Sequence, residues 1–226
     1  MVRKTKEDAD KTRHQLLDAA EKLFQSKGVS RTSLQDIAAE AGTTRGAIYW
    51  HFKDKADLFN AMMDRVTLPL EEAKATVAST KSEKEDALDV LRRSVREALR
   101  QTAADQRTQR VFEIATLQVE YNDEMRAVRE RQESMCEHFT AKASDAIGQA
   151  AEGRQVDLPI PLATAARGLH GLISGLFQNW LLQPHSFDLV QVGAQSIDTY
   201  LRGLGFQLAP LPSPDGNRDA GHSVGR

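Results

Sequence analysis

The spacing of apolar residues constrains this chain most strongly. Apolar residues recur at intervals of three and four along most of its length, and runs that alternate apolar and polar residues are nearly absent. The one Asp-Gly turn signal, Asp215-Gly216, lies in the tail and not between two apolar segments. The pattern predicts an all-α protein. Outside one short motif, we expect helices over about 8–27, 55–79, 83–102, 105–117, 122–152, 161–183 and 187–204.

Length and composition indicate a globular chain. The 226 residues, 40% of them hydrophobic, suffice for one large core or two smaller ones. No stretch approaches about 18 consecutive apolar residues, and the N-terminus leads into polar residues and not into the apolar core of a secretory signal. We therefore expect a cytoplasmic protein without membrane contact. The single cysteine, Cys136, cannot form an intrachain disulfide, and a buried hydrophobic role is favoured over a redox role.

The charge distribution is slightly asymmetric. The net charge is −2, but residues 1–65 hold 12 Lys and Arg against 10 Asp and Glu, whereas the remainder holds 18 against 22. A DNA-binding protein needs a basic surface and not a basic total. The charge count therefore neither supports nor excludes nucleic acid.

Residues 32–52 form a compact motif of two short helices. Thr32 or Ser33 can cap the first, because Gln and Asp stand three residues later as in a capping box, and Gly42 ends it. Thr44 can cap a second helix of barely two turns. Two short helices joined by a tight turn that contains glycine form a helix-turn-helix.

The two faces of this motif differ in chemistry. One face can pack on the first helix as a small core formed by Leu34, Ile37, Ala38, Ala41, Ile48 and Phe52. The other face is aromatic and cationic and carries Arg45, Gly46, Tyr49, Trp50 and His51. Arginine forms bidentate bonds with guanine edges, glycine admits close approach to a base, and tyrosine and threonine bind phosphates. This face predicts a DNA partner.

The run Thr44-Arg45-Gly46-Ala47-Ile48-Tyr49-Trp50-His51-Phe52, followed by Lys53-Asp54-Lys55-Ala56-Asp57-Leu58, closely resembles the TetR family, and in particular its AcrR-like branch of multidrug-efflux repressors. The resemblance is strong over about residues 4–64 and weaker beyond. Thr43 departs from the pattern, because many members have an apolar residue there, usually valine.

The resemblance implies specific DNA contacts. Lys55 would grip a phosphate with help from the N-terminus of its helix. The alternatives are that Tyr49 and Trp50 pack on the first helix and that His51 is an interdomain residue. The implied DNA-binding residues are Ser33, Thr43, Thr44, Arg45, Gly46, Tyr49, Trp50, His51 and Lys55.

The last two predicted helices carry continuous apolar seams, and the first of them also has a stripe of small residues. In the family these helices pair with their symmetry mates, so we expect a homodimer. The alternative is that both seams are buried within one subunit. The predicted dimer-interface residues are Gly171, Gly175, Trp180, Val190, Ala194, Ile197 and Leu201.

The resemblance also implies a cavity for a small amphiphilic or aromatic inducer, with few polar groups among many apolar ones. Each candidate could instead be an ordinary core residue. Glu113 stands out because a buried carboxylate needs a cationic partner or must be neutral. The candidate lining is Val66, Thr67, Leu70, Phe112, Glu113, Thr116, Met135, His138, Phe139, Ile173, Ser174, Phe177 and Gln178.

These expectations combine into one domain plan. Residues 1–65 form an N-terminal three-helix DNA-binding domain with the helix-turn-helix at 33–52, residues 66–207 form a larger helical ligand-binding and dimerisation domain, and residues 208–226 are disordered. Pro69 must kink or break its helix near Thr67 and so provides a fulcrum. The predicted function is a dimeric repressor that leaves its operator when an inducer binds and that controls a multidrug efflux operon. The alternatives are a TetR-type regulator of a metabolic or stress operon, or an activator without an inducer.

Catalysis is not expected. The chain contains no Gly-rich phosphate loop, no Gly-x-Ser-x-Gly and no His-Glu-x-x-His. Its six histidines lack metal-ligand spacing. We therefore expect no enzyme activity, no cofactor and no metal. A helical scaffold or membrane-surface protein is the remaining rival, favoured only if the N-terminal region did not bind DNA.

Overall fold

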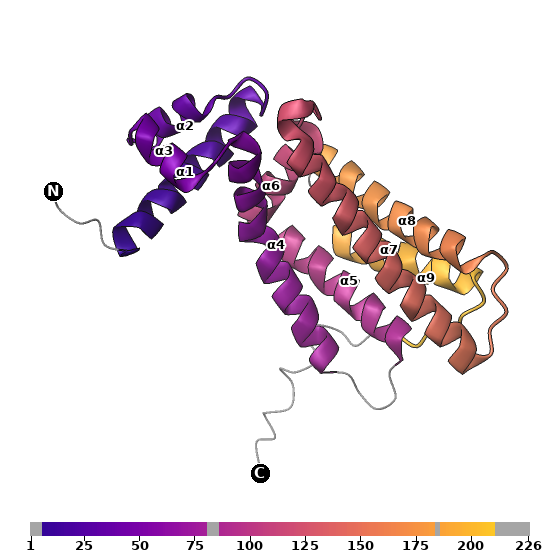
Figure 1. The fold of residues 1–226 in the computed structure, drawn as a ribbon. Helices are drawn as coiled ribbons and strands as arrows, with labels where there is room; N and C mark the ends of the chain where they lie inside the picture. Colours follow the sequence, from indigo (N-terminus) through magenta and orange to yellow (C-terminus); the bar gives the residue numbers. More distant parts are fainter. Residues whose placement is uncertain (1–5, 81–85, 184–185, 211–226) are drawn as a thin grey trace, which may run out of the picture.

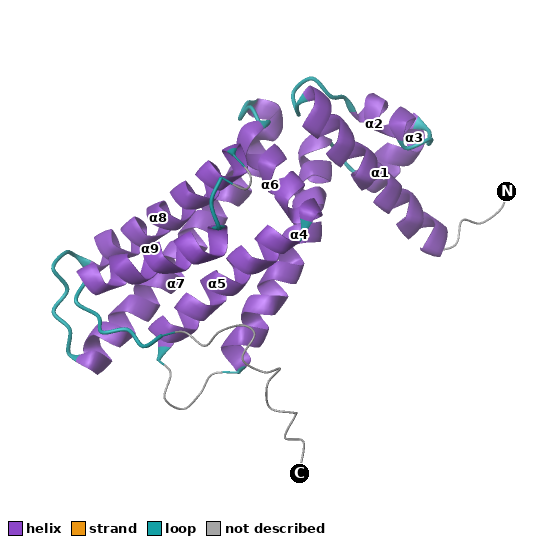
Figure 2. Cartoon of the chain, turned by 180° about the vertical axis from the view of Figure 1, so that it is seen from behind, coloured by secondary structure: helices purple, strands orange, loops and turns teal. Residues whose placement is uncertain are grey.

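The computed structural model describes residues 6–80, 86–183 and 186–210. Over these ranges the chain folds into α-helices and one short 3-10 helix, η1, which confirms the predicted all-α class (Figures 1 and 2). The elements are α1 Lys6–Lys27, α2 Leu34–Glu40, α3 Arg45–His51, α4 Lys55–Ser79, α5 Ala87–Ala104, α6 Gln106–Leu117, η1 Asp123–Met125, α7 Arg126–Arg154, α8 Leu162–Leu182 and α9 Leu189–Gly203.

The helices form two parts joined by α4. Helices α1, α2 and α3 gather at one end of the molecule, and α5, α7, α8 and α9 lie side by side at the other (Figure 1). Helix α6 lies between the two parts and contacts α1, α4, α5 and α8 (Figure 1). We call residues 6–66 the headpiece and the described residues from 67 onward the body.

Local capping signals set the helix ends. The Asp54 side chain caps α4 by accepting the Asp57 amide at 2.8 Å. Gly28 follows α1 with a φ of +84°, a left-handed conformation that glycine adopts without strain. Pro69 does not break α4, which continues as one helix to Ser79. Of the predicted kink or break near Thr67, the break is therefore absent.

The buried side chains form two separate cores. The first unites the headpiece with residues of α6, η1 and the start of α7, namely Val111, Ile114, Met125 and Val128. The second lies between α5, the C-terminal half of α7, α8 and α9. Phe112 packs against both cores. In packing terms, the headpiece core thus extends beyond residue 66 and includes one face of α6.

A cluster of charged side chains reinforces the contact between α1 and α6. Glu21 is only 1% exposed; its carboxylate accepts a hydrogen bond from Arg65 at 3.2 Å and lies 3.5 Å from Arg107. Asp18 pairs with the same two arginines at 2.8 and 3.0 Å. Burial raises the pKa of Glu21, and the guanidinium groups of Arg107 and Arg65 oppose that rise. The cluster holds α1, α4 and α6 in one arrangement.

None of the helices in the described ranges is both long and apolar enough to cross a membrane. The predicted disordered tail falls mostly on residues 211–226, which lie outside the described residues. The described residues 208–210 follow α9 without helical structure.

Candidate nucleic-acid interface

Side-chain caps build the helix-turn-helix. The Ser33 hydroxyl accepts the Asp36 amide at 3.1 Å, and the Asp36 carboxylate accepts the Ser33 amide at 3.0 Å, so the predicted capping box is present. The Thr44 hydroxyl caps α3 by accepting the Ala47 amide at 3.2 Å. Gly42 makes the turn between the helices with a φ of +65°. The local sequence therefore fixes where α2 and α3 begin.

The predicted small core orients α3. Ile48 is 0% exposed and Phe52 is 2% exposed, and both pack in the headpiece core with Leu34, Ile37 and Ala38. With one side of α3 held in this way, the opposite side of the helix must face outward. This outcome confirms the predicted core residues.

The outward face of α3 is aromatic and cationic. Tyr49 is 51% exposed and Trp50 is 72% exposed, which is unusual for side chains of this size. The Arg45 guanidinium carbon lies 5.7 Å from the centre of the Tyr49 ring. At Gly46, an added Cβ would meet only the Thr44 hydroxyl, at 3.9 Å. Packing within the subunit therefore does not require glycine at position 46.

The structure brings most of the predicted DNA-binding residues to this face and its rim. Ser33, Thr44, Arg45 and Gly46 are exposed at the starts of α2 and α3, although the Ser33 hydroxyl is already used by the capping box. The other members are exposed or half-buried on α3 and in the turn before it, and these are Thr43, Tyr49, Trp50 and His51.

Lys55 differs from the expectation. Its side chain is buried, and its ammonium donates to the Thr32 carbonyl at 3.2 Å and pairs with Glu124 of η1 at 2.8 Å. The charge that was predicted to grip phosphate instead joins the headpiece to the body. Turning this buried ammonium toward solvent would break its contacts with both acceptors.

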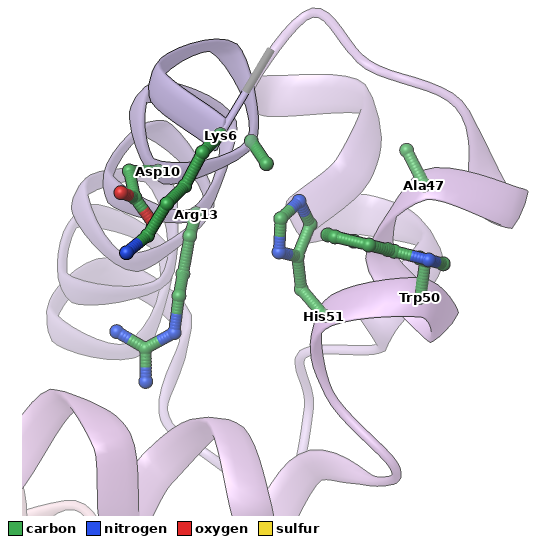
Figure 3. A pocket seen from close by; sticks show the side chains of 7 residues that line it. Lys6, Asp10, Arg13, Ala47, Trp50 and His51 are labelled. Carbon is green, nitrogen blue, oxygen red and sulfur yellow. The ribbon is translucent and has the colours of Figure 1, made fainter. Parts of the chain in front are cut away.

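Sequence reasoning missed two cations beside α3. Lys6 and Arg13 of α1 line an open groove of about 680 Å³ together with Trp50 and His51 of α3 (Figure 3). Their separation of seven residues, which places both on one face of a helix, could have revealed them. The Trp50 and His51 rings are nearly perpendicular, with 4.6 Å between the centres.

The candidate ligand-binding residues divide into inner and outer sets. Inside, the Phe112 and Phe177 rings meet edge to face at 5.2 Å, and the Ser174 hydroxyl lies 3.2 Å from His170. The inner set, buried or half-buried, is Val66, Thr67, Leu70, Phe112, Glu113, Phe139, Ile173, Ser174 and Phe177. The outer set is exposed in the subunit and comprises Thr116, Met135, His138 and Gln178. An inner cavity would thus be lined by the first set alone.

The predicted dimer-interface residues divide in a similar way. Gly171 is exposed on α8, and an added Cβ at Gly171 or Gly175 would meet no atom within 4 Å. Val190 and Ala194 are half-buried and line a shallow groove of about 340 Å³ between α5 and α9.

The three larger members do not lie on an accessible surface. They are at most 5% exposed and already pack within the second core, and these are Trp180, Ile197 and Leu201. Packed in this way they stabilise the subunit itself, and their contact with a partner stays a prediction.

Comparisons with known proteins agree with this architecture. Residues 16–62 match the model of bacterial regulatory proteins of the tetR family, and residues 86–206 match the C-terminal region of MAATS-type transcriptional repressors. The chain is 38% identical over 189 residues to the HTH-type transcriptional regulator AcrR of Shigella flexneri, covering 84% of this chain and 87% of that protein.

Two solved structures are also similar. One is NalD, the secondary repressor of the MexAB-OprM multidrug efflux pump in Pseudomonas aeruginosa, with a TM-score of 0.78, 36% identity and coverage of 88% of this chain and 98% of that one. The other is a SmeT–triclosan complex, with a TM-score of 0.71, 29% identity and coverage of 90% and 100%. The chain therefore belongs to the TetR family, a family of transcriptional regulators and not of enzymes, and it is a DNA-binding helix-turn-helix repressor.

Proposed function

We propose that the chain acts as a homodimer that represses a multidrug efflux operon and leaves its operator when a small amphiphilic ligand binds. The observation that carries the DNA-binding part is the outward face of α3, where large aromatic side chains and an arginine are exposed while the opposite face is locked in the core. An exposed face of this chemistry on a second helix suits the major groove.

Each residue of this face has a role in the proposal. Arg45 reads guanine through two hydrogen bonds, and Gly46 lets the backbone approach the bases. Tyr49 and the Thr44 hydroxyl contact phosphates, and Trp50 packs against the sugar–phosphate backbone. The contacts at the rim come from Ser33, Thr43 and His51. Lys55 is left out, because Glu124 already holds its ammonium.

The ligand part of the proposal rests on the second core and on the relatives. NalD is the repressor of a multidrug efflux pump, and SmeT has been solved with triclosan. In this chain, Phe112, Phe139 and Phe177 are half-buried around the second core, so they can adapt to a flat ligand. Glu113 is half-buried and forms no ion pair with any described residue, so we assign it to a cationic group of the ligand.

The dimer part rests on α8 and α9. Gly171 and Gly175 leave open space on α8, which permits close approach of a partner helix, and Val190 and Ala194 extend the same kind of surface on α9. A single headpiece would read only one half-site and bind weakly. We assign DNA binding to residues 1–65 and ligand binding and dimerisation to residues 66–207.

Release requires a ligand that distinguishes two states. The bound ligand favours a state in which α4 swings and the two copies of α3 no longer fit consecutive major grooves. To lower the fraction of protein that can bind the operator from about 99% to about 1%, the ligand must bind the released state more favourably by about 5.5 kcal/mol. Weaker ligands would induce only partly.

Fluorescence anisotropy of the protein on its own upstream intergenic DNA tests this function. We expect binding that is lost when triclosan or another member of a panel of phenolics and amphiphilic antibiotics is added. Glu113→Gln should weaken the response to cationic compounds and leave the response to neutral ones unchanged. Binding that no compound alters would contradict the inducer part, and an activated reporter gene would contradict repression.

A further inference from the structure

The groove between α1 and α3 has the chemistry of a second DNA contact. Its walls are Lys6, Ala9, Asp10 and Arg13 from the N-terminal half of α1, and Ala47, Trp50 and His51 from α3 (Figure 3). None of the α1 residues belongs to the DNA-binding face proposed above. The groove is open along one side, and α3, which forms its other wall, also carries the proposed reading face.

Two cations of the groove are available to a ligand. Lys6 is exposed, and neither Lys6 nor Arg13 forms an ion pair with a carboxylate in the part of the chain that the structure describes. The Arg13 guanidinium carbon lies 5.3 Å from the centre of the Phe52 ring, and within the described residues its N–H groups have no hydrogen-bond acceptor. The groove therefore presents two positive charges against the single carboxylate of Asp10.

The spacing of these charges suits a phosphate chain. Lys6 and Arg13 are seven residues apart, so they lie on one face of α1 about 10.5 Å apart along the helix axis. Duplex DNA rises 3.4 Å along its axis per nucleotide of one strand, so this separation is larger than the rise between neighbouring nucleotides. The two side chains can thus reach different phosphates of one strand.

The aromatic wall of the groove completes the match. Trp50 is 72% exposed, and its ring forms one side of the groove and lies nearly perpendicular to the His51 ring. A deoxyribose presents an apolar surface next to each charged phosphate. Trp50 can pack on the sugar while Lys6 and Arg13 beside it bind the phosphates. Since α3 has only seven residues, an operator that it reads must also run over the elements beside it.

We propose that this groove seats the sugar–phosphate backbone that flanks the half-site, with Lys6 and Arg13 as its phosphate contacts and Trp50 packed on the sugar. The proposal rests on the proposed function, because it requires α3 to lie on DNA. It adds a contact that carries no sequence information: it sets affinity and orientation, whereas Arg45 sets specificity.

The salt dependence of DNA binding tests the proposal. The full-length protein, its Lys6→Gln and Arg13→Gln variants and the double variant are titrated onto the upstream DNA and onto a random duplex at several salt concentrations. Each phosphate contact contributes about 0.9 to the slope of log K against log salt, so each substitution should lower the slope by about 1.8 per dimer on both duplexes. A matched control is Lys11→Gln, an exposed lysine of α1 that does not line the groove, which should keep the wild-type slope.

Two further variants separate charge from folding. Arg13→Lys keeps the charge and should restore the slope that Arg13→Gln loses. Asp10→Asn removes the repelling carboxylate and should tighten binding several-fold at low salt. Slopes of Lys6→Gln and Arg13→Gln equal to that of Lys11→Gln would overturn the groove contact while leaving the function intact. If the wild type bound its upstream DNA no better than the random duplex, the proposed function would fail instead.

Discussion

A pair of matched isoleucine substitutions tests whether the molecule has two separate cores. Ile114 of α6 and Ile147 of α7 are both 0% exposed, but Ile114 packs with the headpiece and Ile147 packs between α5, α8 and α9. Changing either to alanine removes three buried carbons. The transfer term alone is roughly 2.4 kcal/mol, and the cavity left behind brings the cost to about 3–4 kcal/mol.

Hydrogen exchange locates that cost in the structure. Because 1.4 kcal/mol corresponds to a factor of ten, about 3 kcal/mol should accelerate exchange by roughly 100-fold in the core that is damaged. We expect Ile114→Ala to accelerate exchange in α1 and α4 more than in α9. Ile147→Ala should do the reverse. Equal acceleration of both cores by either variant, or an unchanged α1 in Ile114→Ala, would refute the assignment of α6 to the headpiece core.

Three other predictions follow from local contacts. Ser33→Ala removes the α2 cap and should lower the free energy of unfolding by about 1 kcal/mol in a urea titration, whereas Ser26→Ala, on an exposed turn of α1, should change it little. Gly171→Leu should convert the proposed dimer to a monomer in sedimentation without unfolding the subunit, because an added side chain at that position meets no atom of the subunit itself. Gly153→Leu, equally open but on α7 and outside the proposed interface residues, should remain dimeric. A dimeric Gly171→Leu would contradict the proposed interface. Burial acts to raise the pKa of Asp86, but the hydrogen bond that it accepts from Arg154 of α7 and those from backbone amides outweigh burial, so the net effect is a lowered pKa. Asp86 therefore stabilises the fold above its unfolded pKa of about 3.9 and loses that contribution as pH falls through its folded value. Asp86→Asn keeps the cap of α5 and should show a smaller loss of stability in acid, measured by urea midpoints from pH 6 to 3.

Local signals explain why the fold could be predicted from sequence. Helix starts depend on side chains within three or four residues, as at Ser33, Thr44 and Asp54, so they can be recognised without knowing the tertiary structure. The small core under α3 was also predictable, because its members are close in sequence and share one helical face. Pro69 is the local exception: the sequence predicted a kink or a break near Thr67, and α4 continues as one helix through the exposed proline.

Contacts between distant segments could not be predicted in this way. A seam of apolar residues on α8 and α9 shows that something covers it but not whether the cover is the same subunit or a partner, and Trp180 and Leu201 turned out to be covered within the subunit. Lys55 is a similar case, because its acceptor Glu124 comes from η1, far along the chain. Lys6 and Arg13 line a groove only because α3 folds beside α1, which the sequence around these two residues does not indicate.

Discrimination between specific and random DNA tests the central claim most directly. We predict that the wild-type protein binds its upstream operator at least about 1,000-fold more tightly than a random duplex of the same length at physiological salt. Arg45→Ala should cost about 1–3 kcal/mol per half-site on the operator and far less on the random duplex, because the lost bonds read bases. Equal affinity of the wild type for both duplexes, or an equal loss on both when Arg45 is removed, would contradict the claim that the outward face of α3 reads DNA.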